Sequence, residues 1–245
     1  MMFGKLVFGP FFLLFSSSKS LFKSVSVPAV IYFLVNMEMQ GVLDFFWASG
    51  WLIGGVAYIV LECVLLLLMT LLGVNATRVV LLGGSLSAVG VRWTKRESAY
   101  FLYTLLFMLP LYLMTLPEIF LNKAPLEVRF AYSLLYLVLM IGWVWVFSRL
   151  LLVFPSIAVD GRMSLKDSWR LTRKYQWVFL LSILCVGGMF VVMGGMLQLI
   201  PFGHIAVHAF HTLLALVVSL MLAAYYAEVV VKEIRPEHDR FATEE

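Results

Sequence analysis

Long apolar runs dominate the pattern of the chain and predict helices that cross a membrane. Each run approaches the ~20 residues that an α-helix needs to span the hydrocarbon core of a bilayer. A transmembrane β-barrel is disfavoured because its strands alternate apolar and polar residues over ~10 positions, whereas these runs are continuous. The pattern therefore predicts an all-α membrane protein with six crossings, at residues 25–43, 51–73, 98–121, 130–154, 177–200 and 205–231.

The residues before the first predicted crossing form an amphipathic pattern. On a helix that starts near Pro10, one face gathers Phe11, Leu14, Phe15, Leu21 and Phe22. Lys19 and Lys23 lie on the opposite face with neighbouring serines. This pattern is typical of a helix in the headgroup plane, so we expect an interfacial segment over 1–24 whose lysines face water or anionic lipid. In the alternative interpretation, residues 7–15 begin the first crossing.

A second amphipathic segment lies between the fourth and fifth predicted crossings, and we name residues 155–176 the elbow. Pro155 is expected to end the fourth crossing, and Asp160-Gly161 predicts a turn. Ser164 and Asp167 have the spacing of a capping box, which predicts that a short helix begins there.

The short helix of the elbow has one basic face. Trp169 and Thr172 share a face with Leu165, while the opposite side carries Lys166, Arg170, Arg173 and Lys174. A basic helix at the membrane surface attracts anionic phospholipid by ~1 kcal/mol per cation. The alternative is that these cations only set the orientation of the chain in the membrane.

Composition narrows the class of protein. The 245 residues are 62% hydrophobic and 13% charged, which excludes an ordinary water-soluble enzyme and a disordered chain. Two cysteines cannot form a disulfide scaffold. We therefore expect one membrane domain over 1–235, followed by a polar tail over 236–245.

The distribution of basic residues predicts the orientation. If both termini are cytoplasmic, only Lys123 and Arg129 of the 18 lysines and arginines fall on the outer side. Cytoplasmic loops are enriched in these residues, so the chain is predicted to be N-in and C-in. The basic residues lie at the ends of the predicted crossings, and no soluble domain is apparent that could bind nucleic acid. This argues against nucleic acid as a partner.

Ionisable residues inside the predicted crossings are candidates for function. Glu62 lies within a leucine-rich run, where it must be protonated, paired or hydrated, and a small-solute or lipid transporter would use such a group. His204, His208 and His211 share one helix face, and hydrogen bonding between helices competes there with binding of a metal or haem. We expect no cofactor.

Arg149 and Glu228 lie near the inner ends of their crossings. An ion pair between them is one interpretation, and separate extension of each side chain to the interface is the other.

The elbow also carries a resemblance to a known family. The relevant residues are Arg149-Leu-Leu-Leu-Val-Phe-Pro155-Ser-Ile-Ala-Val-Asp160-Gly161, then Asp167-Ser-Trp-Arg-Leu-Thr172 and Trp177. This segment resembles the YciC-like bacterial inner-membrane proteins and the membrane domain fused to some glycerophosphoryl diester phosphodiesterases. Lys174-Tyr175 departs from the small residue or glycine frequent there, and no phosphodiesterase domain is apparent.

The resemblance implies a membrane module of the bacterial inner membrane rather than a hydrolase, with a role in envelope maintenance. No catalytic motif stands out in the sequence. We therefore expect a non-enzymatic accessory protein or complex subunit that contacts anionic phospholipid, with a membrane-protein partner or a second copy of itself. The contact residues are predicted to be Lys19, Lys23, Arg149, Lys166, Trp169, Arg170, Arg173 and Lys174.

Overall fold

In the computed structural model of the chain, all secondary-structure elements of the described residues are α-helices. The structure describes residues 2–16, 18–48, 50–82, 92–121, 125–199 and 203–233. The helices are α1 (Met2–Ser16), α2 (Ser18–Ala48), α3 (Trp51–Leu82), α4 (Lys95–Leu121), α5 (Leu126–Leu150), α6 (Val153–Ala158), α7 (Leu165–Thr172), α8 (Gln176–Leu197) and α9 (Gly203–Glu233). The all-α prediction is confirmed for these residues.

Five helices in the described ranges are long and apolar enough to cross a membrane. They are Lys19–Met39, Ile53–Leu82, Leu126–Leu150, Gln176–Leu197 and Ile205–Val230. The predicted crossing at 98–121 is helical as α4, but most side chains of its second half lie outside the described residues, and it is not among the five. The protein is therefore a helical membrane protein, while six crossings and their orientation stay predictions.

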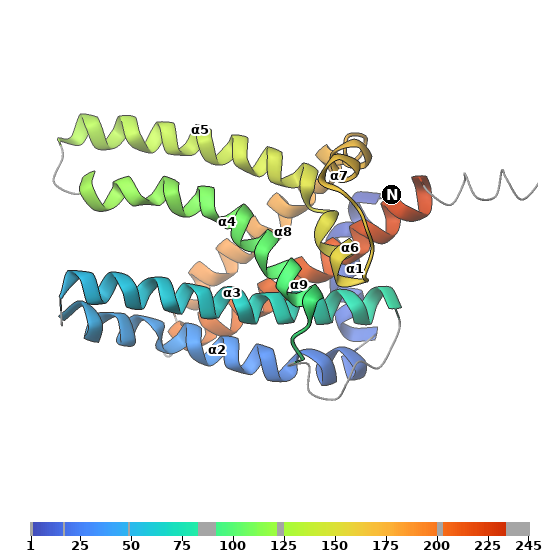
Figure 1. Cartoon of the computed structure of the whole chain (residues 1–245), viewed down its shortest axis with the longest axis horizontal. Coiled ribbons are helices and arrows are strands. Elements are labelled where there is room, and N and C mark those ends of the chain that lie inside the picture. Colours follow the sequence, from blue (N-terminus) through green and yellow to red (C-terminus); the bar gives the residue numbers. More distant parts are fainter. Residues whose placement is uncertain are drawn as a thin grey trace, which may run out of the picture.

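Two antiparallel pairs, α2 with α3 and α4 with α5, are arranged around α8 and α9 (Figure 1). The core follows α9, whose Val217, Leu220, Met221 and Tyr225 are fully buried. Tyr225 stacks on Phe179 of α8 with ring centroids 4.2 Å apart. The short helices α6 and α7 and the N-terminus lie at the same end of the bundle as the last turns of α9 (Figure 1).

The expected interfacial segment over 1–24 differs from the structure. Helix α1 ends at Ser16, and Lys19 and Lys23 belong to the first turns of α2, the helix of the first predicted crossing. Leu21 is 2% exposed and Phe22 is 73% exposed, so the two residues do not share one apolar face. Leu6 and Val7 of α1 are buried in the core with residues of α8 and α9, whereas Leu21 of α2 belongs to a second buried cluster with residues of α3.

The end of the fourth predicted crossing is also different. Helix α5 ends at Leu150, and Pro155 lies in the first turn of α6 rather than terminating α5. A proline is tolerated at that position because the first backbone N–H groups of a helix have no partner within the helix.

Candidate functional site

A groove at the end of α5 brings together five of the eight predicted contact residues. It has a volume of about 430 Å³ and is lined by Arg149, Lys166, Asp167, Trp169, Arg170 and Arg173. Arg149 comes from the last turn of α5, and the others come from α7 and the residue that follows it. Lys174 is not in this lining, and its Nζ lies 5.5 Å from the centroid of the Tyr175 ring.

The local sequence fixes where α7 begins. The backbone N–H of Asp167 donates to the Ser164 hydroxyl over 3.1 Å, and the Asp167 carboxylate accepts from the Ser164 backbone over 3.3 Å. This is the capping box that the spacing predicted. The Ser164 contacts, followed by the nearby Arg170 and Lys166, hold the pKa of Asp167 below its usual range, so the carboxylate is ionised at neutral pH.

Two hydroxyl groups attach α7 to the end of α5. The Ser168 hydroxyl donates to the carbonyl oxygen of Arg149 over 2.9 Å, and the Thr172 hydroxyl lies 2.9 Å from the same oxygen and 2.7 Å from the carbonyl oxygen of Ser168. The last carbonyls of a helix have no partner within it, so these bonds both satisfy the end of α5 and orient α7 across it. In this orientation, Trp169 of α7 lines the groove.

The Arg149 side chain lies beside two indole rings that contact each other. Its guanidinium carbon is 5.0 Å from the centroid of Trp169 and 5.6 Å from that of Trp145, close enough for cation–π attraction. Nη1 donates to the Trp169 carbonyl oxygen over 3.2 Å. Arg149 is only 8% exposed, and its buried Nε has no hydrogen-bond partner. Within the described ranges, no carboxylate forms an ion pair with it.

The charge of the groove is strongly positive. Four cationic side chains and the single carboxylate of Asp167 give its lining a net charge of +3. Arg170 approaches Asp167 to 3.8 Å, but its side chain is 79% exposed, so this ion pair contributes little. The arrangement can therefore hold an anion, with indole rings beside it.

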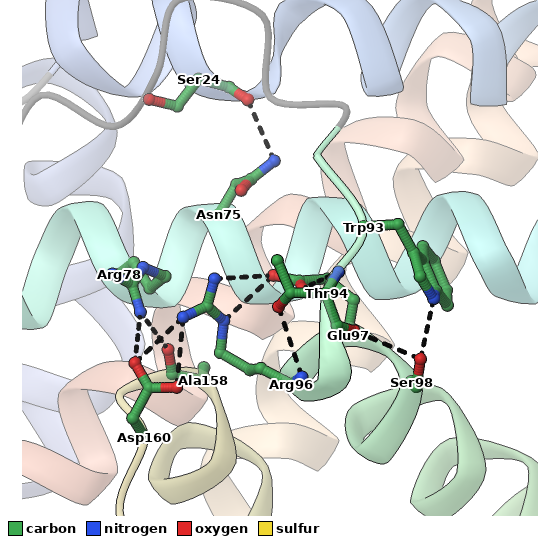
Figure 2. A network of polar contacts seen from close by, with 10 residues as sticks. All are labelled: Ser24, Asn75, Arg78, Trp93, Thr94, Arg96, Glu97, Ser98, Ala158 and Asp160. Atoms are coloured by element: carbon green, nitrogen blue, oxygen red, sulfur yellow. Dashed lines mark hydrogen bonds and ion pairs between the residues drawn. The ribbon is translucent and has the colours of Figure 1, made fainter.

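A second cluster of charges ties three segments together (Figure 2). Nη1 of Arg78, from α3, donates to the Ala158 carbonyl and to Oδ2 of Asp160, each over 3.1 Å. Arg96, from the first turn of α4, donates to the same Asp160 carboxylate over 3.0 and 3.2 Å. These contacts join α3 and α4 to the turn between α6 and α7. Arg78 lies beyond residue 73, where the crossing was predicted to end, because α3 continues to Leu82.

Asp160 has a left-handed backbone with φ of 60°. The Gly161 N–H donates to Ser156 O over 2.7 Å and the Asp160 N–H to Ile157 O over 3.1 Å, which is the Schellman pattern of a helix end. The turn predicted at Asp160-Gly161 is confirmed. A Cβ at position 161 would lie 2.5 Å from the Ser156 hydroxyl oxygen and 3.1 Å from its carbonyl oxygen, so any other residue there would force Ser156 to shift.

Sequence reasoning missed the part of this cluster at the start of α4. The Thr94 N–H donates to Oε2 of Glu97 over 2.8 Å, and the Thr94 hydroxyl bonds to the same oxygen. Thr94-Lys-Arg-Glu97 has capping-box spacing, a signal equal to that of Ser164 and Asp167. Burial of Glu97 raises its pKa, but hydrogen bonds from Thr94 and Arg96 outweigh this effect, and the net pKa lies below its usual range.

The other predicted contact residues lie apart from the groove. Lys19 and Lys23 are exposed near the beginning of α2. Glu228 forms an ion pair with Lys5 of α1 at 2.7 Å. The structure therefore pairs Glu228 with Lys5 of α1, which packs beside α9, and no ion pair joins Glu228 to Arg149 among the described residues.

Glu62 interacts with tyrosine hydroxyl groups of α2 and α3. Its carboxylate is hydrogen-bonded with Tyr58, one turn earlier in α3, and is close enough to Tyr32 of α2 for an electrostatic interaction. The structure thus places a neighbouring tyrosine hydroxyl beside Glu62 as a partner for its carboxylate.

The histidines of α9 do not form a metal cluster among the described residues. The rings of His208 and His211 have centroids 6.4 Å apart, and no group of three His, Cys, Asp or Glu side chains in the described ranges could hold a metal ion. The His204 side chain lies outside the described residues.

Comparison with known proteins adds no relative. The chain matches no protein-family model, no curated protein and no solved structure.

Proposed function

We propose that this chain is a non-enzymatic multi-pass protein of the bacterial inner membrane that binds anionic phospholipid at the end of the bundle where α7 lies. The observation that carries the proposal is the groove of net charge +3 beside the indoles of Trp145 and Trp169. Tryptophan is enriched at the level of the lipid headgroups, and clustered cations at that level attract anionic lipid.

The proposal places α7 and both termini at the cytoplasmic leaflet. The asymmetry of lysine and arginine supports this orientation, as does the position of the N-terminus at the same end of the bundle as the last turns of α9 (Figure 1). Single cysteines near positions 170 and 240, in a chain without Cys63 and Cys185, should both be labelled from the cytoplasmic side of intact vesicles. Labelling from opposite sides would overturn the orientation.

The same proposal makes the protein an accessory or complex subunit in envelope maintenance or assembly. The resemblance of residues 149–177 to the YciC-like proteins supports this role. Mild detergent extraction followed by mass spectrometry of bound proteins and lipids is expected to recover anionic phospholipid and a membrane-protein partner or a second copy. Recovery of the chain alone, with only zwitterionic lipid, would contradict it.

Charge reversal tests lipid binding directly. The full chain is reconstituted in nanodiscs of phosphatidylcholine with about one-fifth phosphatidylglycerol, and enrichment of phosphatidylglycerol around the protein is measured by fluorescence energy transfer from tryptophan to labelled lipid. We expect Arg170→Glu with Arg173→Glu to reduce the enrichment at least about tenfold, because each cation near an anionic surface contributes ~1 kcal/mol.

The matched control makes the same charge change at the predicted outer side, as Lys123→Glu with Arg129→Glu. This control should keep the enrichment. Equal loss in both double variants, or unchanged enrichment after reversal of Arg170 and Arg173, would contradict the proposal.

A further inference from the structure

The groove contains a cation that its surroundings leave incompletely bonded. Arg149 is 8% exposed, its Nε has no hydrogen-bond partner, and no carboxylate of the described residues pairs with it. Burial of a charged group is unfavourable unless the group is paired and hydrogen-bonded. An arginine side chain therefore favours a site where all of its N–H groups have acceptors.

The rest of the lining favours an anion as the missing partner. Lys166, Arg170 and Arg173 line the same groove, and no acidic lining residue other than Asp167 accompanies them. The Asp167 carboxylate already accepts from the Ser164 backbone and hydroxyl, with the hydroxyl contact at 2.6 Å. A planar guanidinium fits the oxygens of a phosphate group with parallel N–H donors.

The helix face below Arg149 favours a lipid as the source of that phosphate. Residues spaced by three and four positions on α5 share a face with Arg149. They are apolar and outward-facing, with exposed fractions of 49% for Leu134, 65% for Val138, 63% for Ile141 and 38% for Trp145. The rise from Val138 to Arg149 is ~16 Å, about half of the ~30 Å hydrocarbon core. Acyl chains of a lipid held at Arg149 would lie along this face.

We infer that the groove is a stoichiometric site for the phosphate group of one glycerophospholipid, with the Arg149 guanidinium as the donor at its base and the apolar face of α5 as the acyl contact. The inference rests on the proposed function and deepens it: a diffuse attraction to the anionic surface becomes one defined site. Arg170 and Arg173 contribute long-range attraction, whereas Arg149 supplies the directional contact.

The test counts lipid molecules that stay on the protein. The full chain from phosphatidylcholine and phosphatidylglycerol nanodiscs is transferred to mild detergent, and native mass spectrometry measures bound phosphatidylglycerol. We expect one equivalent on the wild-type chain. Arg149→Lys keeps the charge but loses the planar donors, and it should weaken retention at least about tenfold, the loss of one charge-assisted hydrogen bond.

Arg129→Lys makes the same change at the other end of α5 and should leave retention unchanged. Thermal unfolding of each variant checks the fold. If Arg149→Lys does not fold, Arg173→Gln at the groove decides the question, with an expected loss of about fivefold from removal of one surface cation. Normal retention in the folded Arg149→Lys chain, or in Arg173→Gln where the former does not fold, would overturn the inference.

A second arm separates the two sources of phosphate. Val138→Ser with Ile141→Ser changes only the apolar face and should weaken phosphatidylglycerol retention without changing the binding of inorganic phosphate. Binding of inorganic phosphate without any retained lipid would overturn the lipid assignment.

The two proposals fail in different ways. If phosphatidylglycerol enrichment in the membrane depends on Arg170 and Arg173 but no equivalent is retained, the defined site is wrong and surface attraction stands. If anionic lipid is neither enriched nor retained, both proposals are wrong.

Discussion

Two clusters of arginines lie at the same end of the bundle, yet their charges are balanced in opposite ways. In the first cluster, Arg78 and Arg96 both pair with Asp160, and Arg96 also pairs with Glu97. Two cations thus meet two carboxylates at distances of 3.0 to 3.1 Å. The groove at α7 instead has a net charge of +3, and its most buried cation, Arg149, has no carboxylate partner in the described part of the chain.

The difference separates a structural role from a binding role. The balanced cluster draws on α3, α4 and the turn after α6, so its charges neutralise one another and fix those segments. The groove keeps a net positive charge that the described carboxylates do not neutralise, so it still attracts anions. Loss of a charge should therefore reduce stability in the first cluster and ligand binding in the second.

The largest effect on stability is expected at the carboxylate that both arginines share. Asp160→Ala should lower the free energy of unfolding by about 2 kcal/mol, because charge-assisted bonds are lost and alanine tolerates a left-handed backbone poorly. The measurement is unfolding in mixed micelles with increasing SDS. Asp160→Gly loses the same carboxylate but accepts φ of 60°, so its loss should be about 1 kcal/mol smaller. Unchanged stability in both variants would show that Asp160 does not hold the cluster.

Replacing one arginine in each cluster by methionine tests the comparison itself. Arg78→Met should cost about 1–2 kcal/mol, since Asp160 and the Ala158 carbonyl lose a donor. Arg149→Met should change stability by less than about 1 kcal/mol, because removal of an unpaired buried cation offsets the lost bond to Trp169. Both are measured by the same SDS titration on lipid-free protein. A larger loss for Arg149→Met would assign Arg149 a structural role.

Acid should weaken the balanced cluster through Glu97. Its pKa is lower in the folded chain than its ordinary value of about 4.3, so its stabilising contribution is present above that value. That contribution is lost as the pH falls through the folded-state pKa. The protein should therefore become easier to unfold once the pH falls below about 4. Glu97→Gln should be less stable at neutral pH and show a shallower drop in stability; an identical profile would exclude Glu97 as the cause.

The smallest effect is expected at Glu62, which belongs to neither cluster. Glu62→Gln should change stability by less than about 1 kcal/mol, because glutamine can still hydrogen-bond with the Tyr58 hydroxyl. Proteoliposomes that contain a pH-sensitive dye should show the same proton permeability for both chains. A permeability that falls on substitution would favour the transporter alternative over the proposed function.

Local sequence patterns predicted much of this molecule. Long apolar runs indicated most of the helices, because the hydrophobicity needed to cross a bilayer is a property of each segment alone. The capping box at Ser164 and Asp167 and the turn at Asp160-Gly161 were also predictable, since their hydrogen bonds join residues a few positions apart. Thr94 and Glu97 offered the same signal.

Contacts between distant segments could be decided only by the tertiary structure. The packing of α1 on α8 and α9, the ion pair of Glu228 with Lys5 and the partners of Asp160 each join residues far apart in sequence. Arg149 shows the reason most clearly. Its sequence position indicated a basic residue at a helix end, but its burial beside Trp145 and Trp169 depends on how α7 packs across α5. Charge is fixed by the residue type, whereas desolvation and pairing of that charge depend on the neighbours that the fold supplies.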